Sequence, residues 1–146
     1  MLSVNSYSQA YINECRLLLD GQILAYNELV SIARKLAEGH AAQLNHALDV
    51  FASHYFNHLI LALDHYFMHR SRAQEMNDGN PLNEVRMLST SILEHQGFLA
   101  ADKNIHYTPA KSILKYKLGD SIKLSEEDFM KLYHAYMDEI EDKFLE

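Results

Sequence analysis

Apolar residues recur at helical spacing along most of the chain. Between residues 6 and 38 they return every three, four or seven positions, which predicts an amphipathic helix. The dipeptide Asp20-Gly21 leaves open whether this segment is one helix or two, and Gly39 is expected to end it. The row that carries the pattern consists of Tyr7, Tyr11, Leu18, Ala25 and Ile32.

Residues 41–76 contain neither glycine nor proline and are apolar over most of their circumference. This pattern predicts one long helix at the centre of a bundle. The turn at 77–80 then leads into a third helix, for which Asn80 is the cap and Pro81 the first residue. We expect this helix to end near Gln96.

The periodicity changes between residues 97 and 124. Residues 113–117 alternate, Gly119 marks a turn, and residues 121–124 resume an extended pattern, which predicts a short β-hairpin. Ser125 and the acidic residues after it predict the start of a last helix. The expected fold is therefore mainly α-helical: a bundle of four to five helices in one domain, residues 1–146, with a hairpin or loop insertion at 97–124.

Composition narrows the classes of function. A net charge of −7 argues against binding to nucleic acid or to anionic lipid. No apolar stretch is long enough to span a membrane, and the N-terminus does not resemble a signal peptide. The single cysteine, Cys15, rules out an intrachain disulfide and fits a cytoplasmic location. Most of the nine tyrosines are expected at the boundary of the core, with a self-association surface as the alternative, so a homodimer stays open.

Four histidines form the clearest candidate for chemistry. His54, His58, His65 and His69 fall within roughly 60° of one another around a single helix. Residues four apart can bind one metal ion together, which gives two pairs of ligands for a divalent transition metal. The first and last histidine are about 22 Å apart along the helix, so the two pairs cannot share one ion.

Each pair needs further ligands from other helices, and acidic or histidine residues on the first and third helices could supply them. The arrangement of a di-iron bundle, which needs Glu-x-x-His on two helices, is missing. The alternative is that the histidines form hydrogen bonds within the core. The candidate additional metal ligands are Glu14, Glu28, Glu94 and His95.

A second candidate site would bind a small anion or another small-molecule ligand. His65, His69, Arg72 and Arg86 could hold a carboxylate or phosphate near the start of the third helix. The alternative is that the arginines at the end of the second helix only complement its dipole.

One short motif resembles a known family. Arg34 and His40 are separated by five residues, which is similar to the Arg-x(4–6)-His motif of HEPN ribonucleases, a family of small helical domains. Motifs for serine nucleophiles, phosphate loops or paired cysteines are missing from the sequence, and we expect Cys15 to be a small buried residue. The resemblance implies a ribonuclease, and it covers only these positions.

Three classes of function follow. The preferred one is a small cytoplasmic binding or regulatory protein that holds a metal ion or small anion along the histidine stripe. The second is an enzyme that uses the same stripe as a metal-dependent or histidine-dependent site. The third is an interaction module that forms a homodimer and has no small-molecule site.

Overall fold

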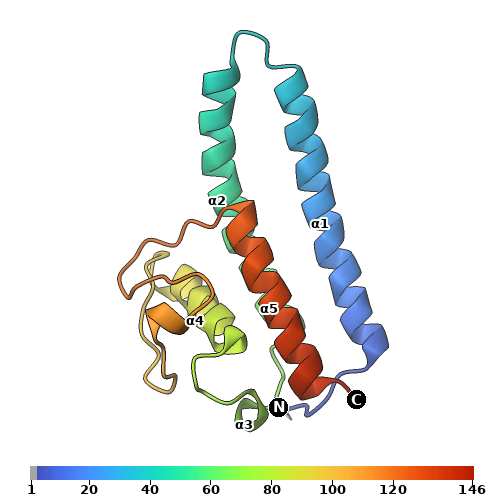
Figure 1. Cartoon of the computed structure of the whole chain (residues 1–146), viewed down its shortest axis with the longest axis vertical. Coiled ribbons are helices and arrows are strands. Elements are labelled where there is room, and N and C mark those ends of the chain that lie inside the picture. Colours follow the sequence, from blue (N-terminus) through green and yellow to red (C-terminus); the bar gives the residue numbers. More distant parts are fainter. Residues whose placement is uncertain (1–2) are drawn as a thin grey trace.

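Two long antiparallel helices determine the shape of the molecule. In the computed structural model, which describes residues 3–146, α1 spans Gln9–Lys35 and α2 spans Ala41–Tyr66. α1 passes through Gly21 without a break, so the first segment is one helix. Gly39 adopts a φ of +77° in the turn between them. The two helices form a hairpin that projects beyond the rest of the protein (Figure 1).

The second helix ends earlier than the sequence predicts. It stops at Tyr66, whose carbonyl accepts a hydrogen bond from the hydroxyl of Tyr11 on α1. Beyond it, Arg70 forms a β-bridge with Val4 near the N-terminus, so the chain there is extended and no longer helical. A single helical turn, α3, then spans Arg72–Glu75. The expectation of one helix over 41–76 is therefore wrong, and His69 lies outside α2.

The other two helices agree with their sequence signals. α4 spans Pro81–Glu94, and the Asn80 side chain accepts hydrogen bonds from two backbone amides of its first turn. α5 spans Glu126–Phe144 and begins with a capping box between Ser125 and Asp128. None of the helices within residues 3–146 is long and apolar enough to cross a bilayer.

The prediction of a β-hairpin at 97–124 is wrong. Among the described residues no strand forms; a single bridge joins Phe98 to Ser121, at the two ends of the insertion, and a 3₁₀ turn, η1, spans Pro109–Lys111. The backbone amides of Ile113 and Leu114 donate to the buried carboxylate of Glu84 on α4, at 2.8 and 2.9 Å. These amides are therefore not available to a partner strand.

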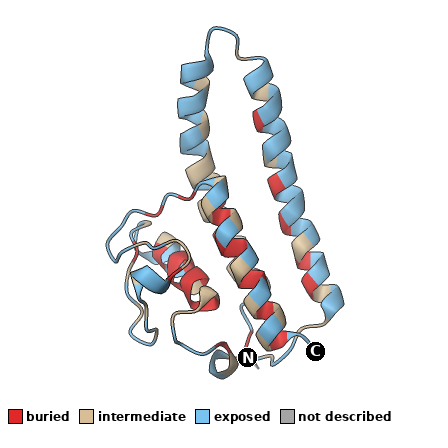
Figure 2. Cartoon of the chain, viewed as in Figure 1, coloured by how far each residue is buried: buried red, intermediate tan, exposed pale blue. Residues whose placement is uncertain are grey.

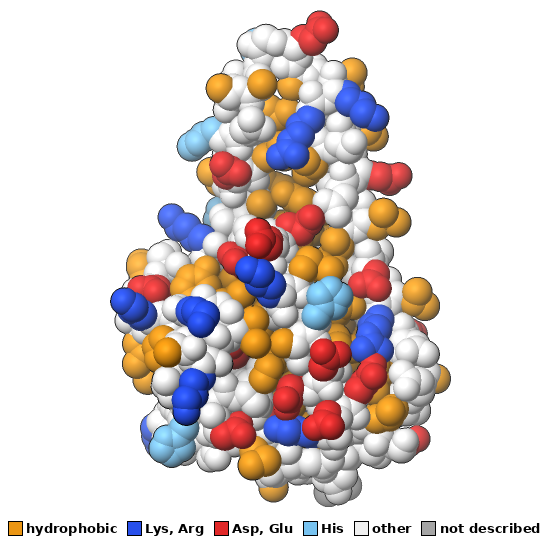
Figure 3. All heavy atoms as spheres, viewed as in Figure 1, with side chains coloured by type: hydrophobic (Ala, Val, Ile, Leu, Met, Phe, Trp, Pro, Cys, Tyr) orange, Lys and Arg blue, Asp and Glu red, His pale blue; other side chains and the backbone are white. Residues whose placement is uncertain are grey.

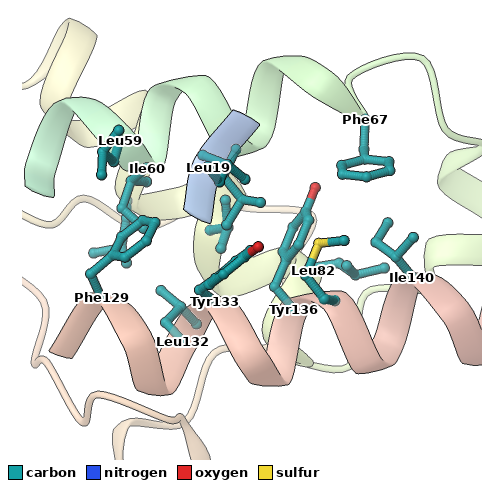
Figure 4. Close-up of a cluster of buried hydrophobic side chains, with 14 of the residues drawn as sticks. Leu19, Leu59, Ile60, Phe67, Leu82, Phe129, Leu132, Tyr133, Tyr136 and Ile140 are labelled. Carbon is teal, nitrogen blue, oxygen red and sulfur yellow. The ribbon is translucent and has the colours of Figure 1, made fainter. Parts of the chain in front are cut away.

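The core lies where α5 packs against α2 and α4 (Figure 4). Phe56, Phe129 and Tyr136 are fully buried there. α2 contacts α1, α4 and α5, as expected of a central helix, and its buried residues lie in its second half. Buried positions thin out along the projecting part of the hairpin: the last in α1 is Val30, and the first in α2 is Phe56 (Figure 2).

Candidate functional site

The histidine stripe lies on the surface. All nine histidines of the chain are exposed, including His54, His58 and His65 on α2. Nδ1 of His58 lies 2.7 Å from the carbonyl oxygen of His54. Within residues 3–146 no group of three or more His, Cys, Asp or Glu side chains is placed to hold a metal ion. The histidines are thus neither part of the core nor joined by a third ligand of this chain.

The additional metal ligands that the sequence suggests are also exposed and lie on separate helices. Glu14 and Glu28 belong to α1, Glu94 is the last residue of α4, and His95 follows it. Glu14 and Glu28 are exposed because their row is not the row of α1 that faces the core. The buried row of α1 consists of Ile12, Cys15, Leu19, Ile23 and Val30.

A second apolar row on α1 lies on the surface instead. Leu18 is half exposed, and Leu29, Ile32 and Leu36 are 58%, 56% and 79% exposed. With Gln22 and Ala25 they follow one another at alternating intervals of four and three residues, which is the spacing of a coiled-coil seam. This row lies roughly 100° around the helix from the buried row. The helix therefore carries two apolar faces and buries only one of them in this chain.

The histidines belong to a matching row on α2. At the same alternating intervals this row contains Ala47, Phe51, His54, His58, Leu61 and His65. Leu36 and Ala47 line the same shallow groove near the hairpin tip, so the two rows lie on the same side of the hairpin. We call this side, made of the α1 row from Leu18 to Leu36 and the α2 row from Ala47 to His65, the open face.

α5 packs on another side of the hairpin, whereas the loop at 123–125 and α4 border the α2 row, at His54 and at Leu61 and His65. The hydroxyl of Tyr133 on α5 donates to Asp20 of α1 at 3.0 Å, and Arg16 pairs with Glu141 of α5. Asp20 lies roughly 200° around α1 from Leu18, so α5 occupies the flank away from the open face. Figure 1 shows α5 crossing in front of the lower part of the hairpin. Figure 3, drawn from that side, shows acidic side chains gathered around α5.

A second candidate site is a cluster of buried charges beneath α3. Arg70 and Glu75 are 2% and 1% exposed, and Nε of Arg70 lies 2.6 Å from Oε1 of Glu75. Arg86 of α4 also pairs with this carboxylate, and Asn83 donates to Oε2 at 2.7 Å. Oδ1 of Asp64 lies 3.7 Å from Nη1 of Arg70. We call Arg70, Glu75, Asn83 and Arg86 the arginine–glutamate cluster.

The cluster determines the ionisation of its carboxylate. Burial alone would raise the pKa of Glu75, but the hydrogen bonds and positive charges of Arg86 and Arg70 outweigh burial and hold this pKa below the usual value of a glutamate. Glu75 is therefore ionised at neutral pH and accepts hydrogen bonds with both oxygens. The cluster fixes the short α3 turn onto the start of α4.

The structure brings together half of the expected anion site. Arg72 and Arg86 both lie beside Glu75, and Arg86 is the strongest of the charged groups that influence Arg72. His65 lies elsewhere, in a shallow groove with Leu93 of α4, and His69 is exposed beyond the end of α2. The first amides of α4 are occupied by the Asn80 cap, so the helix start offers no free donors there.

Sequence reasoning named Arg86 as a candidate site residue but missed the other three members of the cluster. Arg70 and Glu75 fall within the long helix expected over 41–76, and Asn83 falls within the helix expected after it. The signal that could have indicated them is the density of polar side chains on both sides of the turn at 77–80, where a chain reversal brings neighbours in sequence together.

The motif similar to HEPN ribonucleases lies at the hairpin tip. Arg34 and His40 are both exposed and line different grooves, so the structure does not place them in one pocket. Cys15 is buried, as expected, and burial raises the pKa of its thiol. Comparison of the chain with protein-family models, with curated proteins and with solved structures gives no match in any of the three.

Proposed function

We propose that this chain is an interaction protein whose α1–α2 hairpin pairs with a second copy of itself through the open face. The observation that carries the proposal is the exposed row on α1, in which large aliphatic side chains occupy seam positions that no other element within residues 3–146 covers. Monomeric proteins rarely leave a contiguous apolar surface of this length exposed. The histidines of the α2 row would then be interface residues.

The size of the open face suits a homodimer. The open face spans 19 residues on each helix, so it is about 28 Å long at 1.5 Å per residue, and two adjacent helices are about 20 Å wide. Two such faces of about 560 Å² bury about 1,100 Å² in total, which exceeds the roughly 1,000 Å² expected of a biological interface. Two such faces with the same seam spacing can interdigitate as a four-helix bundle.

The charges of the open face also favour a second copy. The chain has a net charge of −7, so most pairs of its surfaces would repel one another. Neither row of the open face contains Asp, Glu, Lys or Arg. A two-fold axis that places this face against itself therefore brings no formal charges of the same sign into contact. A partner with a strongly charged docking surface would find no complementary group there.

The test is the molar mass in solution, measured by size-exclusion chromatography with light scattering at micromolar concentration. We expect the wild type to have about twice the chain mass of 16.8 kDa. Leu29→Glu should have the mass of a monomer, because it places a carboxylate at the centre of the seam. Leu29 is 58% exposed, so the substitution should leave the helical circular dichroism unchanged.

Leu24→Glu is the matched control. Leu24 lies on the same helix and is 65% exposed, but it points away from the open face. This variant should remain a dimer. A monomeric wild type would contradict self-association and would leave the face for a different protein. Equal dissociation by both variants would show that the contact does not run along the α1 row.

A further inference from the structure

We infer that a pocket beside the arginine–glutamate cluster binds a small oxyanion, a carboxylate or a phosphate, through Arg72, Asn77 and Asn104. The pocket has a volume of about 230 Å³ and lies between α3, the turn at 77–80 and the loop at 104–105. It is far from the hairpin tip, so this inference is independent of the proposed dimer.

The floor of the pocket is rigid and its own hydrogen bonds are satisfied. Glu75 and Asn83 form it, and each is 1% exposed. Both oxygens of Glu75 accept hydrogen bonds from Arg86, and Oε2 also accepts from Asn83. The side-chain Oδ1 of Asn83 accepts from the backbone amide of Gly79 at 2.9 Å. The floor therefore offers little free capacity, and a ligand has to be bound by the walls.

The walls of the pocket carry side-chain hydrogen-bond donors that are not paired with other described residues. Within residues 3–146, Arg70 and Arg86 each pair with Glu75, whereas Arg72 forms no ion pair. The side-chain amides of Asn77 and Asn104, which also line the pocket, form no hydrogen bond with another described residue. A guanidinium fork and two amides suit the oxygen atoms of a carboxylate or phosphate.

Arg72 supplies the positive charge of the pocket wall. Arg70 and Arg86 are both paired with Glu75, and Arg70 also lies 3.7 Å from Asp64. Asp102 is the remaining acidic group that acts on Arg72, and its side chain already accepts from the amide of Asn104 at 2.8 Å. Burial, followed by repulsion from Arg86, lowers the pKa of Arg72. A bound anion would relieve this repulsion.

The backbone of the pocket wall is held in an unusual conformation. Met76 has φ 67° and ψ 179°, a region that is almost restricted to glycine. Its carbonyl accepts a hydrogen bond from Asn83 at 3.0 Å, which fixes the wall against the floor. The volume of about 230 Å³ corresponds to about eight water molecules. This is too small for a nucleotide and suits a free ion or a small metabolite.

The experiment measures the melting temperature of the full chain with sodium phosphate and, separately, sodium acetate, at constant ionic strength. At ten times the dissociation constant, a bound ion should raise Tm by about 4–5 °C. A rise with phosphate alone indicates a phosphate ligand, and a rise with acetate alone indicates a carboxylate. Sodium chloride at the same ionic strength serves as the reference.

Arg72→Ala should abolish the rise, and Asn104→Ala should reduce it. Arg34→Ala, an exposed arginine at the hairpin tip, should leave it unchanged. Because Arg72 and Asn104 are both exposed, their variants are expected to fold. An equal rise in wild type and Arg72→Ala, or no rise beyond the chloride reference with either anion, would overturn the inference. Neither result would affect the dimer mass, so the two proposals can fail separately.

Discussion

Glu75→Gln is expected to lower the free energy of unfolding by about 3–5 kcal/mol, the usual cost of removing one partner from a buried ion pair. Glu75 is the nearest carboxylate to Arg70, whose side chain is fully buried. After the substitution the closest acidic atom to Arg70 is Asp64 Oδ1, at 3.7 Å. Arg86 loses its ion pair with the same carboxylate. Urea unfolding followed by circular dichroism measures the loss.

Glu94→Gln is the control for this variant, because Glu94 is exposed at the end of α4 and should change the free energy of unfolding by less than about 0.5 kcal/mol. Similar stability of Glu75→Gln and Glu94→Gln would show that the cluster contributes nothing to the fold.

The same comparison has an expected pH dependence. Because the pKa of Glu75 is lowered in the folded state, the stability it contributes is fully present above the ordinary glutamate pKa of about 4.3. This stability is lost as the pH falls below that value towards the lowered folded-state pKa. The difference in stability between wild type and Glu75→Gln should therefore shrink on acidification. A constant difference from pH 7 down to pH 3 would contradict the lowered pKa.

Gly79→Ala is expected to lower the free energy of unfolding by about 3 kcal/mol. Gly79 has a φ of +88°, which costs an alanine about 1–2 kcal/mol. A Cβ at this position would also lie 2.4 Å from the carbonyl oxygen of His106, a backbone atom that cannot rotate away. The 105–107 loop would have to move, and the hydrogen bond from the amide of His106 to Asn77 would be lost or weakened. Thermal or urea unfolding would show the change.

Gly119→Ala separates the two causes. Gly119 has a similar φ of +91°, but an added Cβ would meet no atom within 4 Å. Gly119→Ala should therefore lower the free energy of unfolding only by the cost of placing alanine at a positive φ, about 1–2 kcal/mol. If the two alanine variants are equally stable, the close approach of the 105–107 loop to the turn at 77–80 is not a feature of the protein in solution.

Helices were largely predictable because their signals are local. The cap at Ser125, the acidic first turn of α5 and the Asn80-Pro81 start of α4 act within one turn of the chain, and each marks a helix start that the structure contains. Local signals failed where a distant residue intervened. Tyr11 and Val4 end α2 before residue 76, and the carboxylate of Glu84 takes the amides that a hairpin at 113–124 would need.

The candidate sites were less predictable, because periodicity identifies an apolar row but not what covers it. Leu18 and Leu19 are adjacent and chemically identical, yet one is half exposed and the other is buried against the neighbouring helices. The sequence pattern identified the row of Leu18 as the apolar face of the first helix. In the structure this row and the histidine row of α2 both lie on the open face, outside the core.

The sequence by itself determined that the protein is mainly helical, where most helices begin, and that residues 41–66 carry a histidine row, because helix formation depends on interactions between near neighbours. Only the tertiary structure decided that this row is exposed, that Arg70 and Glu75 are buried, and that Arg72 faces Asn104. These facts depend on contacts between residues far apart in the chain, and their energies are not contained in any local pattern.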